Sequence, residues 1–221
     1  MDGLLIDTEP VWRTAAREIL AQLGIDLTDA DLLDTTGIRV DEMAAAFLAR
    51  RPPLAPGPTP APGRAPAPSP AEVADRITDA VVAYVARAGE PMPGVPEAIA
   101  LFARHDLGLA IASSSPIRLI DAVCARLNLD IEVRCSALDE PHGKPAPDVY
   151  LAAARRLQLS PARCLALEDS PAGVLAAKAA GMTCVAVPDP LLAGDPRYLR
   201  ADLILSSLTE LDDQTLRAVT T

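Results

Sequence analysis

The sequence has few aromatic residues, no excess of basic residues and no long apolar run. Phenylalanine, tryptophan and tyrosine account for 2, 1 and 3 of its 221 residues, so a core must be built mainly from aliphatic side chains. Its 20 basic and 30 acidic residues give a net charge of −10, which excludes nucleic acid and anionic membranes as expected partners. No apolar stretch approaches the roughly 18 residues that a transmembrane helix needs.

Other absences concern targeting, redox chemistry and common catalytic motifs. The start MDGLLIDTEP has no basic segment of the kind that opens a signal peptide. The four cysteines lie far apart and form no CxxC pair, which is typical of buried thiols in a reducing compartment. We therefore expect a cytoplasmic protein. The glycine-rich nucleotide-binding motifs and the GxSxG motif of serine hydrolases are absent too.

The N-terminal part of the chain is predicted to be helical. Residues 11–23 place their apolar side chains on one helical face, and residues 39–50 and 71–87 continue the helical pattern. Between them, 9 of the 19 residues from 52 to 70 are proline, which forbids a helix. A tolerated surface loop is the simpler interpretation of this segment, and a proline-rich docking ligand is the alternative.

From residue 95 onward, short apolar runs alternate with helical stretches. The runs lie at residues 107–112, 164–167, 183–187 and 202–205. Such alternation predicts a parallel sheet that is covered by helices on both faces. In open sheets of this kind, ligands bind at the carboxyl ends of the strands.

That rule directs attention to three groups of polar residues. Ser113 and Ser114 follow the run LGLAIA, where a helix start can bind a phosphate; helix capping is the alternative. Glu168 and Asp169 follow CLAL and could bind Mg²⁺, or could only complement the helix macrodipole. Lys144 lies in HGKPAPDVYL, whose prolines stiffen the loop; a solvent-exposed lysine is the alternative.

Taken in order, these motifs resemble the haloacid dehalogenase-like phosphohydrolases with a helical cap, in the branch of 2-deoxyglucose-6-phosphate and hexitol phosphatases. The matching segments are MDGLLIDTEPVW, DTTGIR, MPGV, ASSSP, GKPAPDVYL, LALEDSPAGV, AGMTCVAVP and DPRYLRADLILSSLTEL. The resemblance implies an α/β fold with a Rossmann-like parallel sheet core formed by residues 1–9 and 93–221. It also implies an inserted helical cap formed by residues 10–92, with the proline-rich loop at 52–70.

The resemblance further implies Mg²⁺-dependent hydrolysis of small sugar or polyol phosphate monoesters through an aspartyl-phosphate intermediate. Asp2 matches the general acid and base of the family, whose backbone carbonyl also binds Mg²⁺. Ser113 and Ser114 match the groups that bind the phosphoryl group, and Lys144 matches the catalytic lysine. A small-molecule phosphate ester is thus the expected partner, and we expect a monomer.

Four more residues are assigned by the same resemblance. Asp169 and Glu168 match the metal-binding acids. Arg39 lies in a cap loop that faces the active site in relatives, so it either contacts the substrate or is a surface arginine. Trp12 falls where β-phosphoglucomutases carry a catalytic histidine, and it either stacks on a sugar or packs within the cap. A sugar phosphomutase is therefore an alternative function that Trp12 disfavours.

The first motif of the family reads Asp-x-Asp-Gly, and only its second half is present here. The nucleophilic aspartate is expected immediately before Met1, at the end of a first, central strand that this sequence does not contain. We therefore expect the full-length protein to begin upstream, and the chain as given to be inactive. A non-catalytic remnant of the fold is the remaining alternative.

Overall fold

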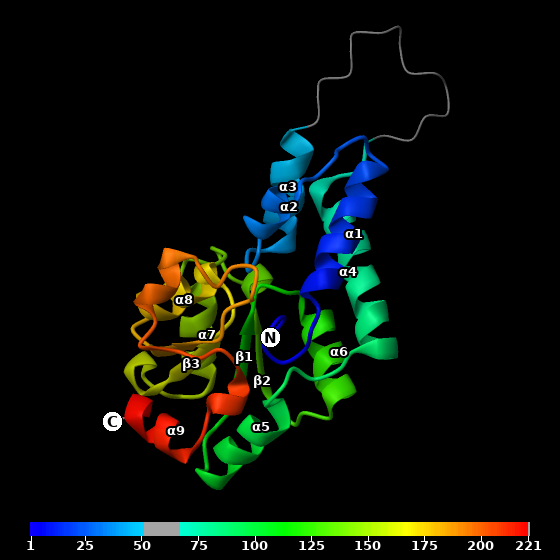
Figure 1. Ribbon diagram of the computed structural model, residues 1–221. Helices are drawn as coiled ribbons and strands as arrows, with labels where there is room; N and C mark the ends of the chain where they lie inside the picture. The colour runs from blue at the N-terminus through cyan, green and yellow to red at the C-terminus, as the bar shows by residue number, and fades with distance from the viewer. Residues whose placement is uncertain (51–66, 221) are drawn as a thin grey trace, which may run out of the picture.

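The computed structural model describes residues 1–50 and 67–220 (Figure 1). The described residues form nine α-helices and five β-strands, which confirms the predicted α/β class. The helices are α1 Glu9–Ala21, α2 Asp29–Leu33, α3 Val40–Ala49, α4 Pro70–Ala88, α5 Val95–Arg104, α6 Ile117–Leu127, α7 Asp148–Arg156, α8 Pro171–Ala179 and α9 Asp213–Thr220. The strands are β1 Ala110–Ser113, β2 Val133–Ser136, β3 Leu165–Glu168, β4 Thr183–Ala186 and β5 Leu203–Ile204.

The strands form two parallel sheets, one of β1 and β2 and one in the order β3-β4-β5. Helices α7 and α8 pack against them through an apolar cluster that is rich in alanine and includes Ala166 and Cys184. The same cluster includes Cys135 of β2, so one apolar layer runs across both sheets. Small side chains in this layer let helices approach the strands closely.

Lys144 links the two sheets. Its Nζ lies 3.3 Å from Ala112 O on β1, and it also forms an ion pair with Glu168 at the end of β3. Among the described residues, β1 pairs only with β2 and β3 pairs only with β4, so each keeps one edge without a strand partner. Met1 and Leu5 pack against an apolar cluster formed by Ile111 of β1, Ile120 and Cys124 of α6, and Ile131.

Strand β2 is the one strand that the sequence pattern did not predict. Arg134 interrupts its apolar residues and Glu132 directly precedes it, so no continuous run marks it. In the structure, the Arg134 guanidinium donates to Ile131 O at 2.7 Å and to Asp121 on α6 at 2.8 Å. These contacts accommodate a charged side chain on a strand at the edge of its sheet.

Helices α1 to α4 pack on one another around a separate apolar cluster in which Leu20 and Phe47 are fully buried. Helix α4 begins with a capping box, in which Ser69 and Glu72 satisfy free backbone N–H groups at its start. The predicted proline-rich loop at 52–70 falls mostly outside the described residues.

Two neighbouring chain segments connect this helical unit to the sheets. Ile6 and Pro91 form a β-bridge, and Met92 N donates to Leu5 O at 3.0 Å. Helix α4 lies next to α6 (Figure 1), whose N-terminus follows β1. The arrangement places the start of α1 and the loop between α2 and α3 over the carboxyl ends of β1 and β3.

The four cysteines are free, and Cys124, Cys135 and Cys184 are buried. Cys164 is half-buried at the start of β3, where its Sγ lies 3.5 Å from Ser160 O. Burial raises the pKa of each thiol, so the neutral form is favoured. In the part of the chain that the structure describes, no helix has the length and apolar character needed to span a membrane.

Candidate active site

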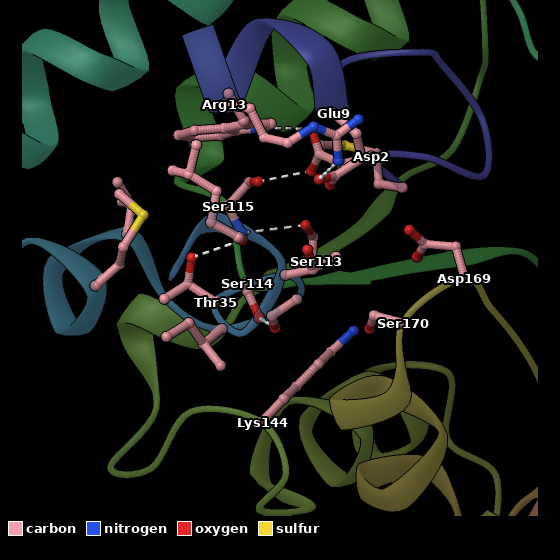
Figure 2. Close-up of a pocket in the computed structure, with 18 of the residues that line it drawn as sticks. Asp2, Glu9, Arg13, Thr35, Ser113, Ser114, Ser115, Lys144, Asp169 and Ser170 are labelled. Carbon is pink, nitrogen blue, oxygen red and sulfur yellow. Dashed lines mark hydrogen bonds and ion pairs between the residues drawn. The ribbon is translucent and has the colours of Figure 1, made fainter. Parts of the chain in front are cut away.

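A pocket lies where β1 and β3 end, beneath the helical unit (Figure 2). Asp2, Ser113, Ser114, Lys144 and Asp169 line it from the sheet side. The sequence pattern selected Ser113, Ser114, Lys144 and Asp169, and the family resemblance added Asp2. The structure brings these residues together from segments far apart in the chain. Their position agrees with the rule that parallel α/β sheets bind ligands at the carboxyl ends of their strands.

The Asp2 carboxylate accepts hydrogen bonds from three side chains. Thr8 Oγ1 and Trp12 Nε1 donate to Oδ1 at 2.6 and 3.0 Å, and Ser115 Oγ donates to Oδ2 at 2.7 Å. Trp12 lines the pocket and also packs against the apolar cluster of the helical unit. It therefore both contributes to apolar packing and donates a hydrogen bond to Asp2. Three donors from different directions fix the orientation of this carboxylate.

The serines after β1 connect the strand end with the helical unit. Ser113 is buried, and its Oγ accepts a hydrogen bond from Ser115 N at 3.1 Å. Ser114 Oγ donates at 2.7 Å to the carbonyl oxygen of Gly37, in the loop between α2 and α3. No side chain caps α6, whose N-cap residue is Pro116, so helix capping does not account for these serines.

Lys144 and Glu168 form a buried ion pair, and the alternative of a solvent-exposed lysine is wrong. Tyr150 OH donates to the same carboxylate oxygen as Lys144, and Ser170 Oγ donates to the other oxygen at 3.1 Å. Burial acts to raise the pKa of Glu168, but the Lys144 ammonium and the Tyr150 hydroxyl lower it, and that pKa lies below its usual value.

Asp169 lines the pocket, whereas the carboxylate of Glu168 is enclosed by its partners and is not among the lining groups. The backbone oxygen of Asp169 accepts hydrogen bonds from Tyr198 OH and from Asp189 N. Gly3, at φ +62°, packs so closely that a Cβ there would overlap the Asp169 carboxylate. Burial and the charge of Glu168 raise the pKa of Asp169 to about 7.

Glu9 and Arg13 on α1 also line the pocket, and the sequence pattern did not select them. Arg13 Nη1 lies 3.6 Å from the Glu9 carboxylate and 3.4 Å from that of Asp189. Burial, with the nearby charges of Asp169 and Asp2, raises the pKa of Glu9 to about 8. An acidic residue in the first turn of a helix is common, so its sequence position gives no sign of this burial.

Arg39 lies outside the pocket lining. Its guanidinium contacts the Asp41 carboxylate at 2.6 and 3.1 Å, and its Nη1 donates to Ala137 O and Glu140 O at 3.4 and 3.3 Å. These contacts join the start of α3 to the loop after β2. The predicted contact between Arg39 and substrate stays a prediction.

The described residues contain no group of three or more His, Cys, Asp or Glu side chains arranged to hold a metal ion. Mg²⁺ does not require such a group, because it retains several waters and binds through one or two carboxylates. Asp169 supplies a carboxylate whose raised pKa reflects burial among other acids. A bound cation would relieve that repulsion, so the donor set fits Mg²⁺.

Residues 1–181 match the family model of the haloacid dehalogenase-like hydrolases. The chain therefore belongs to this family, and the resemblance seen in its sequence motifs is confirmed.

Two relatives and two solved structures show which known proteins the chain is similar to. The chain is 39% identical over 214 residues to hexitol phosphatase B of Escherichia coli (strain K12), which covers 96% of this chain and 91% of that protein. It is 30% identical over 189 residues to the fructose-1-phosphate phosphatase YqaB of the same strain, covering 85% and 93% of the two chains. The crystal structure of CbbY from Rhodobacter sphaeroides in complex with phosphate is similar with a TM-score of 0.79 at 30% identity, covering 96% and 93%. A β-phosphoglucomutase from Clostridium difficile has a TM-score of 0.81 at 19% identity, covers 99% and 93%, and shows the fold alone.

Proposed function

We propose that the protein hydrolyses small sugar or polyol phosphate monoesters with Mg²⁺, through an aspartyl-phosphate intermediate. The observation that carries this proposal is the meeting of Asp2, Ser113, Lys144 and Asp169 in one pocket at the ends of β1 and β3. The similarity to hexitol phosphatase B and to fructose-1-phosphate phosphatase supports the substrate class.

In this proposal the sheet side of the pocket binds the phosphoryl group. The Ser113 hydroxyl, the Ser114 backbone N–H and the Lys144 ammonium bind its oxygens, where negative charge spreads during transfer. Mg²⁺, when held by the Asp169 carboxylate and the backbone carbonyl of Asp2, supplies further positive charge to the same oxygens.

Asp2 carries the proton chemistry. In the first step the nucleophile forms a bond to phosphorus, the ester P–O bond breaks, and Asp2 protonates the departing oxygen of the sugar or polyol. In the second step Asp2 accepts a proton from the water that attacks phosphorus, and the bond between phosphorus and the nucleophile breaks to release phosphate. The hydrogen bonds from Thr8, Trp12 and Ser115 direct the Asp2 carboxylate for both steps.

Three residues that the sequence associated with the site act through others in this proposal. Glu168, predicted from the resemblance to bind the metal, has its carboxylate enclosed by Lys144, Tyr150 and Ser170 and instead fixes the direction of the Lys144 ammonium. Trp12 orients Asp2 through its indole N–H. Arg39 joins the helical unit to the sheet through backbone carbonyl groups.

The nucleophile belongs on a strand between β1 and β3. Each of these strands keeps one edge without a strand partner among the described residues, and Lys144 spans the space between their ends. In the Asp-x-Asp-Gly motif of the family, the nucleophile directly precedes the residue matched by Met1. We propose that this aspartate takes up the phosphoryl group from the substrate.

A sugar phosphomutase and a non-catalytic remnant are the other candidates. The hydrogen bond from Trp12 to Asp2 disfavours a mutase, because an indole N–H cannot accept a proton as the histidine of that family does. Sequencing the in-frame codons upstream of Met1 would distinguish between an enzyme and a non-catalytic remnant. An apolar stretch ending in Asp supports the enzyme, and a stop codon supports the remnant.

The test is phosphate release from a panel of hexitol and hexose monophosphates in the presence of Mg²⁺. We expect release by the protein, and none by its Asp2→Asn variant. Conversion of a hexose 1-phosphate to its 6-phosphate without phosphate release would favour the mutase. Equal turnover by the Asp2→Asn variant and the wild type would overturn the proposed role of Asp2.

A further inference from the structure

Tyr150 on α7 contacts the buried ion pair of Lys144 and Glu168 in two ways. Its hydroxyl donates to Glu168 Oε1, the same oxygen that pairs with the Lys144 ammonium. Lys144 Nζ also lies 5.0 Å from the centre of the Tyr150 ring, and the face of an aromatic ring attracts a cation within about 6 Å. Both the ring and the hydroxyl of Tyr150 therefore act on the ion pair.

Packing alone does not account for the hydroxyl of Tyr150. The side chain is buried in the alanine-rich apolar cluster beneath the sheets, together with Val149 and Ala153 of the same helix. A phenylalanine would fill this space and would present the same ring face to Lys144. Burying a hydroxyl is unfavourable unless it forms a hydrogen bond, and the printed partner of this hydroxyl is the Glu168 carboxylate.

The Glu168 carboxylate is held in one orientation by the groups around it. Its Oε2 accepts a hydrogen bond from Ser170 Oγ at 3.1 Å, and its Oε1 accepts from both Tyr150 and Lys144. Gly173 of α8 lies so close that a Cβ there would overlap the carboxylate. The Tyr150 hydroxyl thus completes the set of contacts that keeps the carboxylate from turning, and it shares the negative charge of Oε1 with the Lys144 ammonium.

These contacts determine where the Lys144 ammonium points. An ammonium group carries three N–H donors. One is directed at Glu168 Oε1, and a second lies against Ala112 O, which is 3.3 Å from Nζ. Lys144 lines the pocket, and Figure 2 shows its side chain extending from its loop toward Ser170 and the middle of the pocket. The third donor therefore remains for a group that enters the pocket.

We infer that Tyr150 is a positioning residue whose hydroxyl, acting through Glu168, directs the third N–H of the Lys144 ammonium at an oxygen of the phosphoryl group. This inference rests on the proposed function, which assigns phosphoryl binding to Lys144. It extends that function to a residue that does not itself line the pocket. Because the phosphoryl group is common to all phosphate esters, Tyr150 should affect every substrate, and inorganic phosphate, to the same degree.

The experiment observes Lys144 directly by NMR. Lys144 and Lys178 are the only lysines in the sequence, so a protein labelled with ¹³C at lysine Cε gives one signal from each, and Lys178→Arg assigns them. Inorganic phosphate is titrated with Mg²⁺ present, and the shift of the Lys144 signal gives the midpoint of binding. We expect Tyr150→Phe, which keeps the ring, to move the Lys144 signal of the free protein and to raise the midpoint about threefold to tenfold. The Lys178 signal should stay in place, because its partner is Asp202.

The other two tyrosines provide matched controls. Tyr198→Phe also removes a buried hydroxyl that donates a hydrogen bond, but the acceptor is Asp169 O, so this variant should lose stability in urea and leave the Lys144 signal of the free protein unchanged. Tyr84 packs against a different apolar cluster, so Tyr84→Phe should change neither the Lys144 signal nor the midpoint for phosphate. Turnover gives a second readout: Tyr150→Phe should lower kcat/KM by one common factor for all esters of a panel of hexitol and hexose monophosphates.

Several results would overturn the inference. An unchanged Lys144 signal and an unchanged midpoint in Tyr150→Phe would mean that the hydroxyl does not direct the ammonium, while phosphate binding by the wild type would leave the proposed function standing. Losses of kcat/KM that differ from ester to ester would show an effect on the alcohol portion instead. A wild type whose Lys144 signal does not respond to phosphate would contradict the proposed function and the inference together.

A measurement on the wild type keeps the inference testable if Tyr150→Phe does not fold. Fluorotyrosine at the three tyrosines gives three ¹⁹F signals, and Tyr84→Phe and Tyr198→Phe identify that of Tyr150 by elimination. Titration with phosphate and Mg²⁺ should move the Tyr150 signal with the same midpoint as the Lys144 signal. A Tyr150 signal that stays in place while the Lys144 signal moves would overturn the inference.

Discussion

Replacing Lys144 by methionine should destabilise the protein far more than the same replacement of Lys178. These two residues are the only lysines in the sequence, and each forms an ion pair with a carboxylate. The side chains of Lys144 and Glu168 are both 5% exposed, whereas those of Lys178 and Asp202 are 29% and 42% exposed. The chain thus offers a buried pair and a matched exposed pair.

The expected magnitudes follow from what each replacement leaves behind. Lys144→Met leaves the Glu168 carboxylate buried without a cation, and such a loss costs about 3–5 kcal/mol. Because Tyr150 and Ser170 still donate to that carboxylate, we expect the lower end of this range. Lys178→Met leaves a partly solvated carboxylate and should cost about 0–1 kcal/mol.

Urea unfolding measures the free energy of unfolding of both single variants. A double variant measures how much of the loss comes from the unpaired charge of the Glu168 carboxylate. Lys144→Met combined with Glu168→Gln removes that charge, so it should recover most of the stability. In Lys144→Met the folded-state pKa of Glu168 should rise above its unfolded value, so the loss should be greatest above neutral pH and should shrink as the pH falls. Equal losses for the two single variants, or a double variant no more stable than Lys144→Met, would refute the reasoning.

Three further changes test other parts of the site. Gly3→Ala places a methyl group against the Asp169 carboxylate and should abolish Mg²⁺ binding in isothermal titration calorimetry. Gly24 also has a positive φ, but nothing lies within 4 Å of its Cβ position, so Gly24→Ala should retain Mg²⁺ binding. The pKa values of Asp169 (about 7) and Glu9 (about 8) in the folded protein exceed those in the unfolded chain, so the folded protein binds more protons. Without Mg²⁺, the free energy of unfolding should therefore fall as the pH rises through about 7 and then about 8. Chemical unfolding across pH should show that Mg²⁺ removes the Asp169 contribution and that Glu9→Gln removes the other. Arg39→Ala should lower the free energy of unfolding, measured in urea, by about 1–2 kcal/mol. An unchanged free energy would show that the contacts of Arg39 with backbone carbonyls do not stabilise the fold.

The strand ends could be predicted from the sequence because each is marked by a local signal. The run at residues 107–112 predicted a strand whose structural counterpart, β1, spans Ala110–Ser113, and Ser113 lies at its carboxyl end. The run CLAL likewise led to β3 and to Glu168. Both runs consist of apolar residues that a buried parallel strand requires, so no knowledge of neighbouring elements is needed to find them.

Features that depend on tertiary neighbours could not be predicted in this way. Strand β2 carries Arg134, whose partners lie on other segments, so its sequence lacks an apolar run. The hydrogen bond from Trp12 to Asp2 arises only when α1 is placed beside the N-terminal segment over the sheets. The enclosure of Glu168 by Lys144 likewise separates two adjacent acids that look equivalent in the sequence.

The most direct measurement is to identify the residue that carries the phosphoryl group during turnover. The full-length protein would be mixed with a hexitol phosphate and Mg²⁺, quenched in acid, and its peptides analysed by mass spectrometry. We predict a phosphoryl group on the nucleophilic aspartate of the family motif, and an Asp2 that carries none. A phosphoryl group on Asp2, or turnover without any phosphorylated aspartate, would contradict the proposed site.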